Sequence, residues 1–365
     1  MKILVIVNTY FGYDGISNVA TNYYIYQDHS QIQMDLVTIN EIPQKLENTI
    51  KENGDFHYVM PQRNKNPFNY IFRLSKLIWK KRYDVVHVHG NSNTMCIELL
   101  AAKLGQCKTR IAHSHNTKCD HPIINKLLYP IFKFTYTDAF ACGIEAGEWL
   151  FNKGEANIIA NGVDLKRFTL DSQYRKNFKK ELNVENRVVI GHVGRFSIQK
   201  NHERLIEIFA KLVELDSNVT LLMWGEGELL DHIKNISQKI NGDIRFMGTS
   251  SEIEKCLHAV DIIVFPSLYE GLPLFLIEAQ ALGLPCLLSD NVSPNTKITN
   301  SVYYKSLTSS NSDWAKEILK ITSKSNVEKN ALTAHEEIRN AGYDIRLKAK
   351  ELLNKYQQLI HKNNG

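Results

Sequence analysis

The sequence predicts an α/β protein made of two doubly wound domains, each a parallel sheet with helices on both faces. Short β-branched runs alternate with amphipathic stretches along the chain, a pattern typical of parallel sheets. The alternation falls into two series, separated by a polar, charged stretch at 171–187. A length of 365 residues is long for one domain and sufficient for two cores.

The first series predicts a domain at residues 1–165, because the break is easiest to place after the segment 161–168. Its strands are expected at 2–7, 33–39, 84–89, 110–115, 139–142 and 157–161. Its helices are expected at 17–28, 67–82, 92–104 and 144–152.

The second series predicts a domain at residues 166–343. Its strands are expected at 187–193, 219–224, 244–247, 261–266 and 285–290. Its helices are expected near 202–214, 228–240, 250–258, 274–282 and 313–323. A last helix at 344–361 has no strand after it, so the pattern alone allows it to pack on either domain.

Composition excludes several classes of protein. A net charge of +5 is too weak to indicate nucleic-acid binding, and no such motif accompanies it. Six cysteines without a C-x-x-C pair indicate reduced thiols rather than disulfides or zinc. No apolar run has the length of a signal peptide or a membrane span. We therefore expect a cytoplasmic protein.

Two glutamates stand out in the stretch YEGLPLFLIEAQALGLP at 269–285. Glu278 lies in an apolar run, where an unpaired carboxylate is costly, and Glu270 lies in the turn before it. Pro273 is expected as the first helical residue, which leaves free backbone N–H groups suited to a phosphate. These amides belong to Gly271, Leu272 and Leu274. Alternatively, Glu278 only complements the helix dipole and Glu270 is a solvated charge.

A pair of cations follows the expected strand at 187–193. Gly194 lets the chain turn, and Arg195 and Lys200 come before the next helix. A guanidinium fork and an ammonium at such a turn suit a diphosphate. The alternative is that both are ordinary surface charges.

The loop NTYFGYDGISNVA at 8–20 contains Gly12 and Gly15, which permit close approach of the backbone to a ligand. It lacks the G-x-G-x-x-G spacing, so the dinucleotide interpretation is weak. Taken alone, a plain loop with Ser17 as the helix N-cap is favoured.

Histidines occur in two H-x-H pairs, His87 with His89 and His113 with His115. Residues two apart share a strand face and can present two metal ligands, but no third ligand lies at matching spacing nearby. We therefore expect no metal site. His115, at a strand end, is expected to line the ligand site, and the other three to be core histidines.

Taken together, these motifs resemble the retaining nucleotide-sugar glycosyltransferases of the GT-B fold, family 4, which build bacterial surface polysaccharides. The resemblance covers nearly the whole chain through DGIS, DVVHVHG, RIAHSHN, ANGVD, GHVGRFSIQKN and PSLYEGLPLFLIEAQALGLP. There are two departures. Asp14-Gly15 replaces the usual glycine pair, and a glycine-rich segment is replaced by residues 291–307.

The resemblance implies a role for each charged position. Glu270 contacts the donor sugar, and Glu278 binds the ribose hydroxyls of the nucleotide. Arg195 and Lys200 neutralise the leaving diphosphate in place of a metal ion.

The remaining contacts follow from the same resemblance. Backbone amides at 271–274 and the loop holding Gly15 assist with the diphosphate, and His115 lies beside the sugar. The last helix returns to the first domain. No nucleophile is identified, and the family's favoured hypothesis is a front-face route in which the leaving phosphate helps to deprotonate the acceptor.

The expected function is metal-independent, retaining transfer of a hexose or N-acetylhexosamine from a UDP-sugar to a lipid-linked glycan. It would serve capsular or exopolysaccharide synthesis and would need no cofactor. Two alternatives remain open: a UDP-sugar epimerase of the same fold, and a non-catalytic sugar-nucleotide-binding protein.

A peripheral membrane contact is also expected. Residues 66–82 and 125–134 mix bulky apolar side chains with basic ones, a composition that suits an interfacial helix on the anionic inner leaflet. The alternative is that the apolar side chains face the domain's own sheet.

Overall fold

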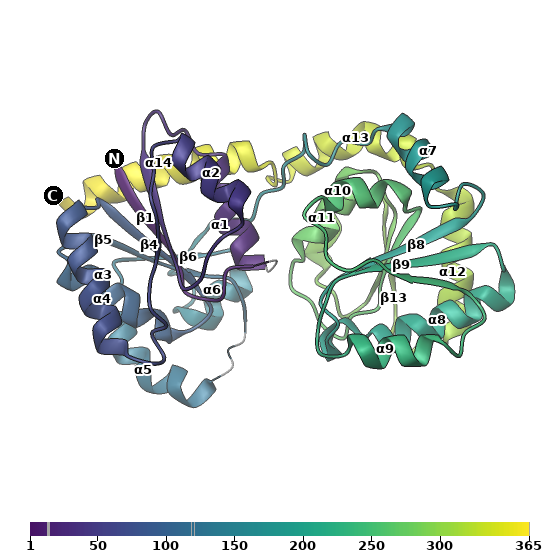
Figure 1. The fold of residues 1–365 in the computed structure, drawn as a ribbon, viewed down its shortest axis with the longest axis horizontal. Coiled ribbons are helices and arrows are strands. Elements are labelled where there is room, and N and C mark those ends of the chain that lie inside the picture. Colours follow the sequence, from purple (N-terminus) through teal and green to yellow (C-terminus); the bar gives the residue numbers. More distant parts are fainter. Residues whose placement is uncertain (13–14, 118, 120, 365) are drawn as a thin grey trace. The chain divides into compact units, whose positions relative to one another are not determined.

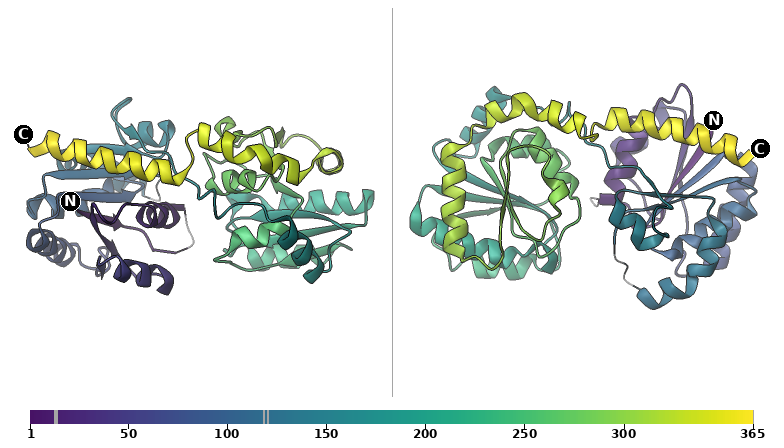
Figure 2. Two further views of the ribbon diagram at one scale, coloured as in Figure 1. Left: turned by 90° about the horizontal axis from the view of Figure 1, so that it is seen from above. Right: turned by 180° about the vertical axis from the view of Figure 1, so that it is seen from behind.

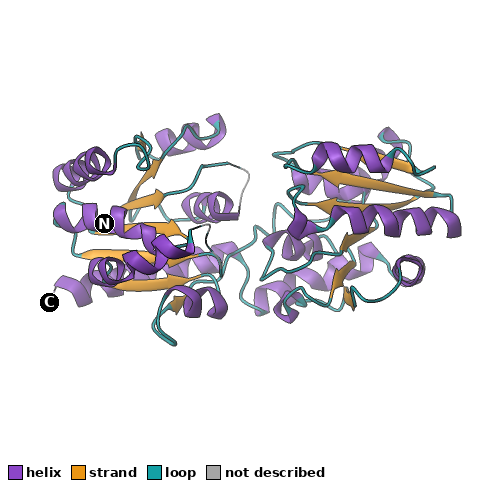
Figure 3. Ribbon diagram, turned by 90° about the horizontal axis from the view of Figure 1, so that it is seen from below, coloured by secondary structure: helices purple, strands orange, loops and turns teal. Residues whose placement is uncertain are grey.

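The computed structural model describes residues 1–12, 15–117, 119 and 121–364. The chain divides into two compact units: unit 1 comprises Met1–Gly162 and Gly342–Gly365, and unit 2 comprises Val163–Ala341. In each unit, a sheet of parallel strands lies between layers of helices (Figure 3). The predicted fold class, two doubly wound α/β domains, is confirmed.

Unit 1 contains a parallel sheet with the order β3-β2-β1-β4-β5-β6-β7. Its strands are β1 (Lys2–Val7), β2 (Gln33–Thr38), β3 (His57–Val59), β4 (Val85–Gly90), β5 (Thr109–Ser114), β6 (Asp138–Ala141) and β7 (Asn157–Ile158). Its helices are α1 (Gly15–Ile25), α2 (Gln44–Glu52), α3 (Pro67–Lys81), α4 (Cys96–Leu104), α5 (Pro122–Thr135), α6 (Ile144–Leu150) and α14 (Ile345–Asn364).

The two faces of the unit 1 sheet are covered by different helices. Alternate residues of a strand point to opposite faces, so Val86 and Val88 pack in the apolar core with α3 and α4. His87 points the other way and meets Tyr356 of α14. Helix α14, yellow in Figures 1 and 2, therefore covers the face of the sheet opposite α3 and α4.

Unit 2 contains a parallel sheet with the order β10-β9-β8-β11-β12-β13. Its strands are β8 (Val188–Val193), β9 (Val219–Trp224), β10 (Asp243–Phe246), β11 (Ile262–Phe265), β12 (Cys286–Ser289) and β13 (Val302–Lys305). Its helices are α7 (Ser172–Glu181), α8 (His202–Leu215), α9 (Leu230–Ser237), α10 (Ile253–Cys256), α11 (Leu274–Ala281), α12 (Asn311–Lys324) and α13 (Val327–Asn340).

Five elements were not predicted, namely α2, β3, α7, β13 and α13, and α5 was expected only as an interfacial segment at 125–134. Helix α7 buries one side chain, that of Arg175, and α5 contains Pro130 and leaves most of its apolar residues exposed. Strands β3 and β13 are only three and four residues long.

Among the described residues, no helix combines the length and apolar character needed to cross a bilayer. The longest helix, α14, has 20 residues but carries charges along its length.

Candidate active site

The candidate residues of unit 2 lie where its strand order reverses. Strands β8 and β11 are neighbours at the middle of the sheet, and the chain continues from them to opposite edges. The loop with Arg195 and Lys200 follows β8, and the turn with Glu270 follows β11. In doubly wound sheets, ligands bind at the carboxyl ends of the strands beside this reversal.

Lys200 and Glu270 form an ion pair across these two loops. The Lys200 Nζ lies 2.6 Å from the Glu270 Oε1, and their side chains are only 17% and 9% exposed. The contact lacks hydrogen-bond geometry, so it is held by charge. The lysine stem lies so close to Gly194 that a Cβ there would stand 3.1 Å from it. Gly194 therefore makes room for Lys200.

Arg195 pairs with a carboxylate that sequence reasoning missed. Its Nε donates to the Glu228 Oε2 at 3.0 Å, with both side chains largely exposed. Glu228 follows Gly225 and Gly227, whose φ values of 139° and 157° suit glycine. A Cβ on Gly225 would stand 2.0 Å from the carbonyl oxygen of Gly194. The G-E-G-E run directly after a strand was the signal available in the sequence.

The two loops are also joined by one backbone hydrogen bond and two bonds from side-chain amides to backbone carbonyls. The Leu268 N–H donates to the Gln199 carbonyl at 2.9 Å, and the Gln199 amide donates to the Tyr269 carbonyl at 3.1 Å. The Asn201 amide donates to the Pro266 carbonyl at 3.0 Å. These bonds fix the spacing at which Lys200 and Glu270 meet.

Glu278 lies in α11, half-buried, and desolvation raises the pKa of its carboxyl to about 7. Arg167 opposes this shift, although its guanidinium bonds Glu254 at 2.6 Å. Strongly perturbed carboxyls gather at functional sites, so Glu278 is a candidate ligand-binding group. Arg167 and Glu254 were not identified from the sequence.

The start of α11 differs from the prediction in one respect. Pro273 is not the first helical residue but the N-cap, with an extended ψ of 115°. The first N–H groups of a helix have no partner four residues back, and Leu274 is the first helical residue. Leu272 precedes the cap, and Gly271 is exposed with open space where a Cβ would stand. The backbone at 271–274 is accessible to an anion.

In unit 1, the loop after β1 leads into α1 at Gly15, which is exposed and has open space around its Cα. Asp14, the departure from the usual glycine pair, lies outside the described residues. The expectation that Ser17 caps the helix is wrong, because α1 begins two residues earlier. The Ser17 hydroxyl instead accepts a hydrogen bond from the Gly12 N–H at 3.1 Å.

Four histidines on β4, on β5 and directly after β5 form one group, which we call the histidine array: His87, His89, His113 and His115. The parallel register pairs His89 with His113, so the two H-x-H motifs lie side by side. Nitrogen atoms of His87, His89 and His113 lie within 4.8 Å of one another. The statement that no third ligand lies near an H-x-H pair is therefore wrong, because spacing along the chain does not reveal register between strands.

The geometry of the array does not favour a metal ion. A tetrahedral zinc ion would need nitrogens about 3.4 Å apart, with lone pairs that converge. The rings of His87 and His113 instead lie within 10° of parallel and point nitrogens at each other rather than at a common centre. Burial lowers the pKa values of all four, to about 3 for His87 and His115, so the rings are neutral at pH 7.

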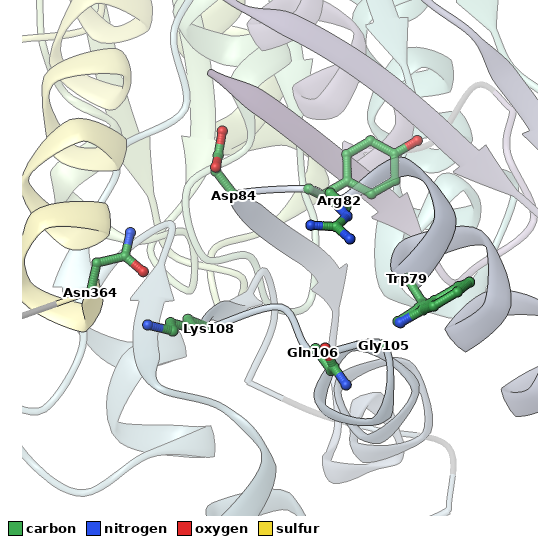
Figure 4. A pocket seen from close by; sticks show the side chains of 8 residues that line it. Trp79, Arg82, Asp84, Gly105, Gln106, Lys108 and Asn364 are labelled. Atoms are coloured by element: carbon green, nitrogen blue, oxygen red, sulfur yellow. The ribbon is translucent and has the colours of Figure 1, made fainter.

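A surface cavity of about 270 Å³ lies elsewhere in unit 1 (Figure 4). It is lined by Trp79, Arg82, Asp84 and Lys108, among others. Asp84 and Lys108 come just before β4 and β5, so the cavity lies at the amino ends of the strands. It is separate from the candidate site at the carboxyl ends.

Comparison with known families identifies the chain. The family model described as "Glycosyl transferases group 1" matches residues 173–339, and "Glycosyl transferase 4-like" matches residues 21–142. The putative glycosyltransferase EpsF of Bacillus subtilis is 30% identical over 368 residues, covering 96% of this chain and 95% of EpsF. The chain belongs to the group 1 glycosyltransferases, family GT4.

Two further similarities concern the fold and the wider family. The crystal structure of Anabaena HepE in complex with UDP has a TM-score of 0.79 and 14% identity, covering 98% of this chain and all of HepE. The Escherichia coli UDP-Gal:α-D-GlcNAc-diphosphoundecaprenol α-1,3-galactosyltransferase is 30% identical over 247 residues, or 63% of this chain and 64% of that enzyme. The glycosyltransferase has the GT-B fold, and its family acts with retention. The family assignment favours transfer over the epimerase and binding-protein alternatives.

Proposed function

We propose that the protein transfers a hexose or N-acetylhexosamine, with retention and without a metal ion, from a UDP-sugar to a lipid-linked glycan. The transfer would serve capsular or exopolysaccharide synthesis. The observation that carries the proposal is the Lys200–Glu270 pair, with Arg195 beside it, at the strand reversal of unit 2. Cations and a carboxylate so placed suit the diphosphate and the sugar of one donor.

Each candidate residue has one role in this proposal. Glu278 accepts hydrogen bonds from the ribose hydroxyls, and Glu270 contacts the sugar. Arg195 and Lys200 stabilise the charge that develops on the leaving diphosphate, which is the largest contribution to catalysis. The amides at 271–274 add donors to the same charge.

Unit 1 supplies the remaining residues. His115 acts as a neutral hydrogen-bonding group beside the sugar, in line with its low pKa. Gly15 keeps the start of α1 open to the phosphates. The structures of HepE with UDP and with UDP-glucose support a UDP-sugar as the donor, because HepE shares this fold.

The acceptor is proposed from the relatives. The Escherichia coli relative is named for a diphosphoundecaprenol-linked acceptor. A polyprenyl acceptor would lie in the inner leaflet of the plasma membrane, so the enzyme would work at that surface.

An exposed face of unit 1 suits such a surface. Helices α3, α4 and α5 contact one another in that order. Helix α5 presents an apolar stripe to solvent, with Ile123, Leu127 and Phe134 each more than 70% exposed. On α3, Phe68 and Phe72 are exposed in the same way, but Tyr70, Leu74 and Ile78 face the core. The alternative, in which the apolar side chains face the domain's own sheet, is therefore correct for about half of those on α3 and wrong for most of those on α5.

Basic side chains accompany this apolar stripe. Lys126 and Lys133 lie on α5, Lys76 and Lys80 lie on α3, and the Lys103 ammonium stands 3.4 Å from the centre of the Phe134 ring. An apolar stripe with a basic margin binds anionic lipid, with about 1 kcal/mol for each basic residue near the surface. We propose peripheral attachment to anionic lipid through this face.

The membrane proposal is tested by flotation with vesicles of phosphatidylglycerol and phosphatidylcholine. The protein should float with anionic vesicles at low salt, and the double variant Leu127→Ser with Ile131→Ser should not. Leu332→Ser, at a residue that is 83% exposed in unit 2, is the matched control and should float. Equal flotation of the double variant would exclude this face as the attachment site.

The transferase proposal is tested with a panel of UDP-sugars and a polyprenyl-diphosphate-linked acceptor. We expect UDP release that depends on the acceptor, a product with the donor's anomeric configuration, and no effect of EDTA. Isomerisation of the donor without acceptor would instead indicate an epimerase. Binding of UDP without turnover across the panel would indicate a binding protein.

A further inference from the structure

Two imidazole–imidazole hydrogen bonds connect β4 to β5 in the histidine array. The His87 Nε2 lies 3.0 Å from the His113 Nδ1, and the His89 Nδ1 lies 2.9 Å from the His115 Nε2. Both bonds join residues 26 positions apart. In a parallel pair of strands, a contact between two side chains recurs two residues further along both strands, so the second bond repeats the first. The second bond ends at the ring that the proposed function places beside the sugar.

The array is anchored at its inner end. The Tyr356 hydroxyl of α14 bonds the His87 Nδ1 at 2.6 Å, and Phe140 of β6 packs edge-on against His87 at 5.5 Å. His87 and His113 are 0% exposed, and His89 is 2% exposed. The His89 ring stacks on the His87 ring, with the ring centres 4.3 Å apart, and this contact restricts the orientation of His89. The anchored rings thereby hold His89 in one orientation.

This geometry restricts the chemistry of His115. In a bond between two neutral imidazoles, one ring donates and the other accepts, so the tautomer of His115 is tied to the tautomer of His89. The His115 Nε2 is engaged with His89, which leaves its Nδ1 as the nitrogen that is not used in this bond. Without His89, the ring of His115 could rotate and take either tautomer.

We propose that His89 is a positioning residue that fixes the orientation and tautomer of His115 and does not itself contact substrate. The inference rests on the proposed role of His115 in sugar transfer. His89 is buried beneath His115, stacks within the anchored array and has a neutral ring, so its effect on the donor passes through the single bond to His115.

The test compares two substitutions of His89. Asparagine places an amide near the position of the imidazole Nδ1 and can keep the bond to His115, whereas leucine fills similar space without a polar atom. We expect His89→Leu to lower kcat about 100-fold, the loss expected from a misplaced catalytic group. His89→Asn should retain most of the activity, and both variants should bind UDP as the unchanged protein does.

A double-mutant cycle separates positioning from a general loss of packing. In a His115→Ala background, His89→Leu should cause little further loss, because the residue it acts through is gone. Tyr83→Phe, which removes a buried hydroxyl that bonds Asp35 outside the array, is the control for buried polar losses and should leave kcat near that of the unchanged protein. Equal, additive losses from His89→Leu in both backgrounds would overturn the proposal.

A readout independent of turnover keeps the inference distinct from the proposed function. Long-range ¹H–¹⁵N spectra of the histidine side chains report the tautomer of His115 directly. We expect one tautomer in the unchanged protein and in His89→Asn, and a mixture in His89→Leu. The same mixture of tautomers in the unchanged protein and both variants would refute the positioning role of His89, even if sugar transfer is confirmed. A single tautomer lost only in His89→Leu would support it even if the donor is not a UDP-sugar.

Discussion

The two units carry opposite kinds of polar cluster at the carboxyl ends of their sheets. Unit 2 holds two ion pairs, of which Arg195 with Glu228 is largely exposed and Lys200 with Glu270 is mostly buried. Unit 1 holds neutral imidazoles that are buried and bonded to one another. An exposed ion pair contributes little to stability, so Arg195 can exchange its carboxylate for a ligand phosphate at small cost. A buried hydrogen-bonded array loses more free energy when a partner is exchanged, so it is better suited to holding a side chain in one orientation.

The sharpest test of this contrast removes the central cation of unit 2. Lys200→Ala should lower kcat about 100-fold, because loss of one charged contact to a leaving group costs about 3 kcal/mol. Initial rates at saturating donor and acceptor measure it. Lys211→Ala, a surface lysine on α8 that pairs with Glu214, is the matched control. Activity of Lys200→Ala near that of the control would remove Lys200 from the mechanism.

A second test distinguishes the ribose contact from the diphosphate contact. Glu278→Gln should weaken the binding of UDP about 10-fold, because the variant loses charge-assisted hydrogen bonds to the ribose. It should weaken UMP equally, because both contain the ribose. Calorimetric titration with the two nucleotides measures the ratio. A larger loss for UDP than for UMP would move Glu278 to the phosphates.

A third test asks whether Glu270 competes with the donor for Lys200. Glu270→Gln leaves the mostly buried Lys200 ammonium without its carboxylate, so the diphosphate becomes its counter-charge and UDP affinity should rise about fivefold or more. Turnover of the UDP-sugar should fall, because the sugar loses its contact. Affinity and turnover are measured on the same preparation. Weaker UDP binding would show that Glu270 holds the nucleotide rather than the lysine.

The smallest expected effect concerns pH. Burial raises the folded-state pKa of Glu278 from an ordinary 4.5 to about 7, so the folded protein keeps a proton that the unfolded chain has lost. Stability is therefore lost as pH rises from about 4.5 to about 7. Glu278→Gln removes this loss of stability. We therefore expect the Tm difference between Glu278→Gln and the unchanged protein to be roughly 3 °C larger at pH 8 than at pH 4.5, in favour of the variant.

The histidine array has the opposite dependence on pH. Its folded-state pKa values are lowered, so the unfolded chain binds more protons once pH falls below about 6.5, and stability is lost there. Melting curves from pH 4.5 to 8 record both trends. Glu336→Gln, an exposed carboxylate of α13, controls for removal of any single charge. A Tm difference for Glu278→Gln that does not grow with pH would contradict the raised pKa.

The sequence by itself determined the fold class and the position of each charged candidate along the chain. Strand periodicity located β1, β8 and β11, and the residues that follow them include Gly15, Arg195, Lys200 and Glu270. This succeeded because buried parallel strands are short apolar runs that read clearly, and the residues just after them lie at the carboxyl edge. Very polar or short elements, such as α7 and β13, contain too few apolar residues to be found.

Only the tertiary structure decided which residues meet. The pairing of Lys200 with Glu270 spans 70 residues, and that of Arg195 with Glu228 spans 33. The contact of His89 with His115 depends on the register between β4 and β5, and the anchor at Tyr356 depends on the return of α14 to unit 1. Local sequence encodes periodicity and turns, but register and long-range pairing follow from how side chains fill a common core.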